Sequence, residues 1–201
     1  MKLAKRRRRK PNLYKGAIAG KLGGFAGAWA MNQFQTAWSI AGKALERCCE
    51  PSPLASNRRA ESSDFEANEG PREDATMKAA NKIAQAVLHH ELTWEQKQKL
   101  GPVVHFAFGT AMGGFYGAAA EYRREVTTGF GAAFSTALFI GADEIAVPAA
   151  GLSGSSGSFP RSLSRSLKET PLSTHAYALL SHLVYGWTTE AVRRTVRRAL
   201  R

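Results

Sequence analysis

Stretches without charge alternate with charged segments along this chain. Four windows contain no Lys, Arg, Asp or Glu: Leu22 to Gly42, Leu100 to Ala120, Val126 to Ala142, and Thr170 to Thr189. Each window is about as long as the 17–25 residues that an α-helix needs to cross a bilayer core. The pattern therefore predicts an all-α fold, a polytopic membrane protein with four transmembrane helices. The mean hydropathy of the whole chain, −0.28, averages these windows with the charged segments between them.

The predicted organisation follows the windows from one end of the chain to the other. It has a basic disordered tail (1–13), transmembrane helix 1 (14–42), an extramembrane segment (43–99), transmembrane helix 2 (100–122), transmembrane helix 3 (128–148), a Gly/Ser-rich loop (149–172), transmembrane helix 4 (173–192) and a basic tail (193–201). Apolar residues recur at helical spacing within the extramembrane segment, which predicts an amphipathic helix over 73–90. Such a helix would lie on the membrane surface or cap the bundle.

Glycines at intervals of four residues mark one face of each of the first two predicted spans. These are Gly16, Gly20 and Gly24, followed by Gly109, Gly113 and Gly117. Small residues at this spacing let two helix backbones approach closely. We therefore expect these faces to be helix-packing surfaces, and self-association into a homo-oligomer is one use for them.

The chain is strongly basic, with 28 Lys and Arg against 16 Asp and Glu, a net charge of +12. The densest basic runs, 5–10 and 193–198, flank predicted spans, as positive-inside charge does. This distribution predicts both termini on the cytoplasmic side of an inner (plasma) membrane, next to its anionic leaflet. Nucleic acid is not an expected partner, because no stripe of basic residues with interleaved aromatics appears in the sequence.

Polar residues fall toward the outer half of the predicted spans. They are His105, Asp143, Glu144, His175 and His182. Ionisable groups at such depth cost roughly 2.5–3.5 kcal/mol each unless they are paired or hydrated. Three interpretations stay open: hydrogen-bonded groups at the interface, a proton or ion relay, and a metal site. Their spacing matches no established metal motif, so no metal is assigned.

Acidic and basic residues meet at the inner ends of helices 2 and 4. Glu121 lies beside Arg123 and Arg124, and Glu190 lies beside Arg193 and Arg194, which predicts interfacial ion pairs. No phosphate-binding glycine loop, nucleophile elbow or activated Cys–His pair occurs. The sequence therefore indicates no enzyme, no catalytic residues and no cofactor.

Several short motifs match a known pattern. They are His105 ahead of Gly113-Gly114-Phe115-Tyr116-Gly117 and Glu121; Pro148 with Gly151-Leu152; Ser181 to Trp187 before Glu190 and Arg193-Arg194; and Gly16 to Gly20. With these motifs the chain resembles the YagU-like family of bacterial inner-membrane proteins. The resemblance implies a small multi-helix membrane protein without an assigned activity, and it transfers no catalytic residue.

Three functions are compatible with these features. The first is an integral inner-membrane protein with a proton- or ion-linked role at the polar cluster. The second is a non-catalytic membrane assembly or scaffold protein, which the glycine faces and the amphipathic segment favour. The third is a soluble basic nucleic-acid-binding protein. The sequence specifies no substrate, transported species or partner.

Overall fold

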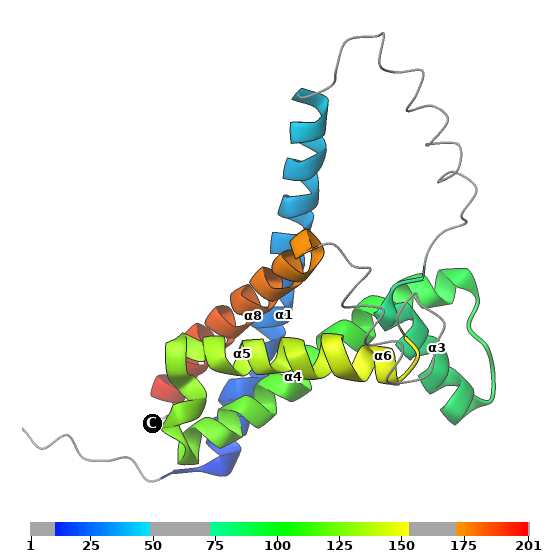
Figure 1. Ribbon diagram of the computed structural model, residues 1–201. Helices are drawn as coiled ribbons and strands as arrows, with labels where there is room; N and C mark the ends of the chain where they lie inside the picture. Colours follow the sequence, from blue (N-terminus) through cyan, green and yellow to red (C-terminus); the bar gives the residue numbers. More distant parts are fainter. Residues whose placement is uncertain (1–10, 49–72, 153–171, 201) are drawn as a thin grey trace, which may run out of the picture. The chain divides into compact units, whose positions relative to one another are not determined.

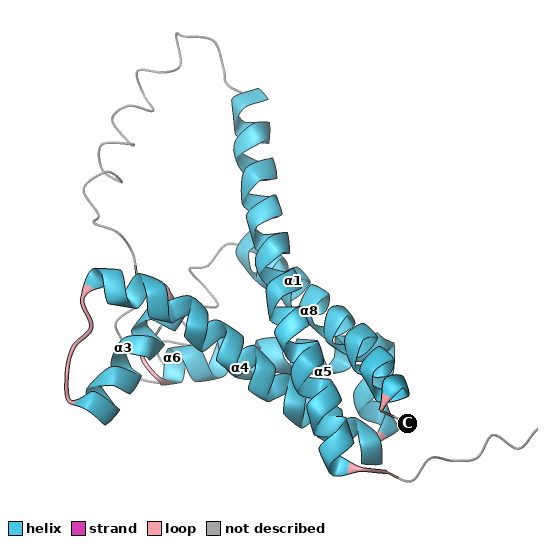
Figure 2. Ribbon diagram, turned by 180° about the vertical axis from the view of Figure 1, so that it is seen from behind, coloured by secondary structure: helices cyan, strands magenta, loops and turns pink. Residues whose placement is uncertain are grey.

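The computed structural model describes residues 11–48, 73–152 and 172–200. Every regular element in those ranges is helical, and none is a strand (Figure 2). The elements are α1 (Leu13–Cys48), α3 (Ala75–Leu88), α4 (Trp94–Tyr122), the 3₁₀ segment η2 (Arg124–Gly131), α5 (Ala132–Leu138), the π-helical segment η3 (Phe139–Ala146), α6 (Val147–Ala149) and α8 (Leu172–Ala199). Residues 1–10 of the predicted tail (1–13), residues 49–72 of the predicted extramembrane segment (43–99) and most of the predicted loop (149–172) lie outside the described residues.

Local capping explains where several helices begin. Asn12 accepts a hydrogen bond from the Lys15 backbone N–H at 2.9 Å, at the first turn of α1. Asp74 caps α3 through the Met77 N–H at 2.7 Å. Thr93 and Gln96 form a reciprocal capping box ahead of α4, with bonds of 2.9 and 3.4 Å. Each side chain satisfies backbone donors that a helix start leaves unpaired.

The described residues divide into two compact units. The first unit, called the bundle below, comprises residues 11–31, 105–143 and 172–200. The second unit takes residues 32–48, 73–104 and 144–152, and it has a small apolar core of Ala80, Ala84 and Leu92 with Val104 packed against it. The helices α1 and α4 each contribute residues to both units.

Figure 1 shows α1, α4, α5 and α8, the helices of the bundle. Glycines form the close contacts between them. Gly16, Gly20 and Gly24 of α1 meet Gly117, Gly113 and Gly109 of α4, so the two helices run antiparallel. A second α1 face, formed by Gly23 and Gly27, meets Thr189 and Tyr185 of α8. A methyl group added at Gly113 would lie 2.5 Å from both the Gly20 carbonyl oxygen and the Gly24 Cα. These faces are therefore used inside one chain.

The turn between α4 and α5 also depends on glycine. Gly129 and Gly131 have φ of 62° and 92°, and Phe130 shares the left-handed region at 59°. The Gly131 Cα approaches the Gly186 carbonyl of α8, where a side chain would not fit. This turn lets α5 fold back against α8, with which it packs.

The prediction of four membrane-spanning helices is wrong. Among the residues that the structure describes, no helix combines the length and the apolar character needed to cross a membrane. The predictions of a multi-pass, transmembrane protein in an inner membrane are therefore also wrong. The physical reason is that absence of charge is not the same as hydrophobicity. Window 22–42 contains Asn32, Gln33, Gln35, Thr36 and Ser39, and all the windows are rich in Gly, Ala, Ser or Thr.

The third window fails for a further reason. Its first residues belong to η2, where Thr128 is extended and the next three residues are left-handed. The α-helical part, α5, has only 7 residues before the chain continues as a π-helix. The predicted helix at 128–148 is therefore a broken series of helical segments.

Candidate functional site: a buried ion-pair network

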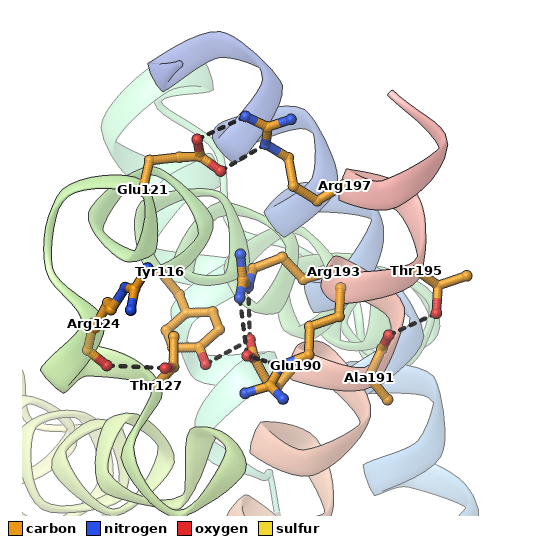
Figure 3. A network of polar contacts seen from close by, with 10 residues as sticks. Tyr116, Glu121, Arg124, Thr127, Glu190, Ala191, Arg193, Thr195 and Arg197 are labelled. Carbon is orange, nitrogen blue, oxygen red and sulfur yellow. Dashed lines mark hydrogen bonds and ion pairs between the residues drawn. The ribbon is translucent and has the colours of Figure 1, made fainter. Parts of the chain in front are cut away.

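The bundle contains a buried charged network (Figure 3) in addition to an apolar cluster of Ala28, Met31 and Tyr185. The Glu190 side chain is fully buried and accepts a hydrogen bond from the Tyr116 hydroxyl at 2.8 Å. Arg193 donates to both Glu190 carboxylate oxygens, at 2.6 and 2.9 Å. Arg194 adds a third guanidinium contact at 2.5 Å. The network joins α4 to α8.

A second ion pair lies one turn further along α8. Arg197 donates two hydrogen bonds to the Glu121 carboxylate, at 2.6 and 2.8 Å. The Asn12 backbone N–H donates to the same carboxylate at 3.0 Å, just before α1 begins. Glu121 therefore connects the start of α1, the end of α4 and the end of α8.

Helical spacing explains how one face of α8 supplies these groups. Glu190, Arg193, Arg194 and Arg197 occupy positions i, i+3, i+4 and i+7, which lie on the same side of a helix. Tyr116 and Glu121 face them from α4. The bidentate Arg–carboxylate geometry is the strongest form of such a pair.

The electrostatics of the network favour charged carboxylates. Burial raises the pKa of Glu190, but hydrogen bonds from Arg193, Arg194 and Tyr116 outweigh burial and bring the pKa below its ordinary value. Arg197 is the main cause of the lowered pKa of Glu121; burial opposes it and the Asn12 N–H assists it. Burial, followed by the bond to Glu190, raises the pKa of Tyr116. Tyr116 thus remains a neutral donor.

Acid should weaken the bundle. A carboxyl group with a lowered folded-state pKa stabilises the fold above its unfolded pKa and loses that contribution as the pH falls through the folded pKa. We therefore expect the free energy of unfolding to fall below pH about 4.5. Urea unfolding across a pH series measures it. A Glu121→Gln variant should lose less stability on acidification than the wild type, and an equal loss would contradict this assignment.

Of the five polar residues predicted to cluster, the structure brings Asp143 and His182 close to each other. Asp143 and His182 approach each other, with 3.7 Å between the carboxylate oxygen Oδ2 and Nε2. His182 is buried, its Nδ1 lies 2.9 Å from the Ala178 carbonyl oxygen, and its ring lies against Phe139. His105 lies on α4 beside Phe106. His175 lies in the first turn of α8 and Glu144 follows Asp143 in η3.

The ion pairs near the helix ends differ in part from the predicted partners. Glu190 does contact Arg193 and Arg194, whereas Glu121 contacts Arg197. Arg123 and Arg124 are exposed. Sequence reasoning missed Tyr116 and Arg197 as network members. Counting seven residues on from Glu190 would have indicated Arg197, whereas nothing in the sequence marks Tyr116 as the partner of Glu190.

The network is chemically closed. Its carboxylates are bound to guanidinium groups, and Tyr116 donates to Glu190. Within the described ranges, no group of three or more His, Cys, Asp or Glu side chains is arranged to bind a metal ion. The arrangement orients and joins helices. Comparison with protein-family models, curated proteins and solved structures finds no match to this chain.

Proposed function

We propose that this chain is a non-catalytic assembly protein, a helical scaffold that pairs with a second copy of itself through the outer face of α1. The observation that carries this proposal is the distribution of side-chain size. The largest fully buried side chains are Tyr116, Glu190, Thr189, Ser135 and Ser181. Many large apolar side chains are instead exposed, and exposed apolar patches commonly mark interaction surfaces.

One exposed apolar row on α1 is continuous. The α1 stripe comprises Tyr14, Ile18, Leu22, Phe25 and Trp29, each between 51% and 78% exposed. The intervals are four, four, three and four residues, which is the spacing of a helix–helix seam. The glycine faces of the same helix are already packed against α4 and α8. The stripe is therefore the side of α1 available to another molecule.

The area of the α1 stripe suits a symmetric pair. Side chains of this size present about 100 Å² each when half exposed, so two facing stripes would bury roughly 1,000 Å² in total. That value is at the lower limit for a specific protein interface. A second copy supplies the same stripe, so a two-fold pair covers both surfaces at once.

The proton- or ion-linked alternative has less geometric support. It depends on the Asp143–His182 pair, one contact of 3.7 Å between η3 and α8. A separation of 3.7 Å is longer than a hydrogen bond through which a proton passes directly. We therefore favour assembly over proton transfer.

The stripe proposal predicts a change in mass. Wild-type protein should sediment as a dimer, and Ile18→Gln/Leu22→Gln should weaken the dimer at least about 100-fold in Kd, because four apolar side chains lose their burial across the pair. The matched control is Ile83→Gln/Val87→Gln, an exposed pair at the same spacing on α3. A monomeric wild type would contradict the proposed function. Equal weakening by both variants would contradict the stripe.

A further inference from the structure

Four segments of the bundle meet at one end, although they are far apart in sequence. Asn12 contacts Glu121, and Arg197 contacts the same carboxylate. The Lys15 ammonium donates to the Leu200 carbonyl oxygen at 2.8 Å, and the Arg194 guanidinium lies 4.6 Å from the centre of the Phe130 ring. The start of α1, the end of α4, η2 and the end of α8 therefore share one surface.

That surface carries net positive charge. We call it the basic end, and it consists of Lys15, Arg123, Arg124, Arg194 and Arg198. Two nearby acids are paired within the fold: Glu190 binds Arg193 and Arg194, and Glu121 binds Arg197. The cations of these segments still outnumber the acids. Among the described residues of these four segments, Glu125 is the exposed acid.

Apolar side chains are interleaved with these cations. Leu13, Tyr122 and Phe130 are 47%, 61% and 41% exposed. Arginine guanidinium groups bind phosphate oxygens in bidentate fashion. Exposed Leu, Tyr and Phe beside Arg and Lys are typical of surfaces that lie at the headgroup level of a bilayer. A nucleic acid would use the cations and aromatic rings, but it offers no apolar phase for Leu13.

We propose that the basic end binds the phosphate groups of an anionic phospholipid surface, with Leu13 and Tyr122 at the level of the headgroups. Charge complementarity supplies the attraction, which falls within a Debye length and weakens with salt. The contact involves the surface of the lipid layer. It is independent of the pairing of two copies, because it uses a different set of side chains from Ile18 and Leu22.

The experiment measures how full-length protein partitions onto vesicles. Vesicles of phosphatidylcholine containing phosphatidylglycerol are compared with vesicles of phosphatidylcholine alone. The test variant is Arg124→Gln/Arg198→Gln. The matched control is Lys43→Gln/Lys99→Gln, which removes the same charge from exposed positions of the second unit. A Tyr122→Ser variant tests the apolar contribution. The wild type and the three variants are all full-length, so each retains residues 1–10.

We expect wild-type protein to bind the anionic vesicles and not the neutral ones. Each surface cation should contribute about fivefold, so the Arg124/Arg198 variant should bind roughly 25-fold more weakly and the control much less so. Tyr122→Ser should also weaken vesicle binding. Circular dichroism checks that each variant keeps the helical content of the wild type.

Three results would overturn the inference. The first is absence of binding to the anionic vesicles. The second is equal weakening by the test and control variants, which would show that net charge alone acts. The third concerns a single-stranded oligonucleotide that displaces the wild-type protein from vesicles. If the Arg124/Arg198 variant no longer binds this oligonucleotide but binds vesicles as tightly as the wild type, the inference is wrong. That third result would assign the basic end to nucleic acid.

Discussion

A Gly113→Ala substitution should cost the bundle about 3 kcal/mol or more of unfolding free energy. The added methyl would lie 2.5 Å from the Gly20 carbonyl oxygen and from the Gly24 Cα. Both are backbone atoms, so relief requires α1 and α4 to separate. Overpacking of a core typically costs about 1–3 kcal/mol, and a clash between two backbones belongs at or above that range. Urea and thermal unfolding, followed by circular dichroism, measure the loss.

The matched control is Gly42→Ala, the same change inside α1. A methyl at Gly42 meets nothing within 4 Å. Alanine is about 0.5–1 kcal/mol more favourable than glycine inside a helix, so this variant should be as stable as the wild type or slightly more stable. If Gly113→Ala behaves like Gly42→Ala, the close packing of α1 on α4 is incorrect.

A Glu190→Gln substitution should be the most damaging change to the network, at about 3–5 kcal/mol. Glutamine keeps the shape of the side chain but removes the charge that Arg193 and Arg194 contact. Arg193 is itself buried, so its guanidinium would retain its charge without the carboxylate partner. The free energy of unfolding measured in urea tests this expectation.

Two comparisons separate burial of charge from a general sensitivity to substitution. Glu125→Gln makes the same change at an exposed position and should stay within about 0.5 kcal/mol of the wild type. Tyr116→Phe removes one hydrogen bond to a charged acceptor and should cost about 1.5–3 kcal/mol. Losses of the same size for Glu190→Gln and Glu125→Gln would show that the network does not stabilise the fold.

The sequence indicated the all-helical class through long uncharged windows. The sequence did not establish whether those helices are surrounded by lipid or by other helices of the chain. A window such as 22–42 lacks charge because its glycine face packs on other helices, and polar side chains such as Asn32 and Gln33 are exposed. Charge counting cannot distinguish that situation from a lipid-facing helix, whereas hydropathy can.

The site was only partly accessible to sequence reasoning. Glycines at a spacing of four indicate a close-packing face, but not which helix packs on it, because the partner is set by the fold. Glu190 and its neighbours Arg193 and Arg194 are local in sequence, so helical spacing alone places them together. The Arg197–Glu121 pair spans 76 residues and depends on the parallel alignment of α4 and α8, which also pairs Gly109 with Tyr185 and Tyr116 with Glu190. The predicted grouping of His105 with His175 depends on their depth in membrane-spanning helices. Because the described helices are not membrane spans, that grouping has no basis.

Assembly through the α1 stripe is the central claim, and a distance between two copies tests it most directly. One spin label per chain is placed at Lys21→Cys, beside the stripe, in a background with Cys48→Ser and Cys49→Ser. The same label at Gln85→Cys on α3 is the control. We predict a defined dipolar distance between Lys21 labels of two copies, lost in Ile18→Gln/Leu22→Gln and absent for the α3 label. Absence of dipolar coupling at Lys21 in protein that sediments as a dimer would contradict the account.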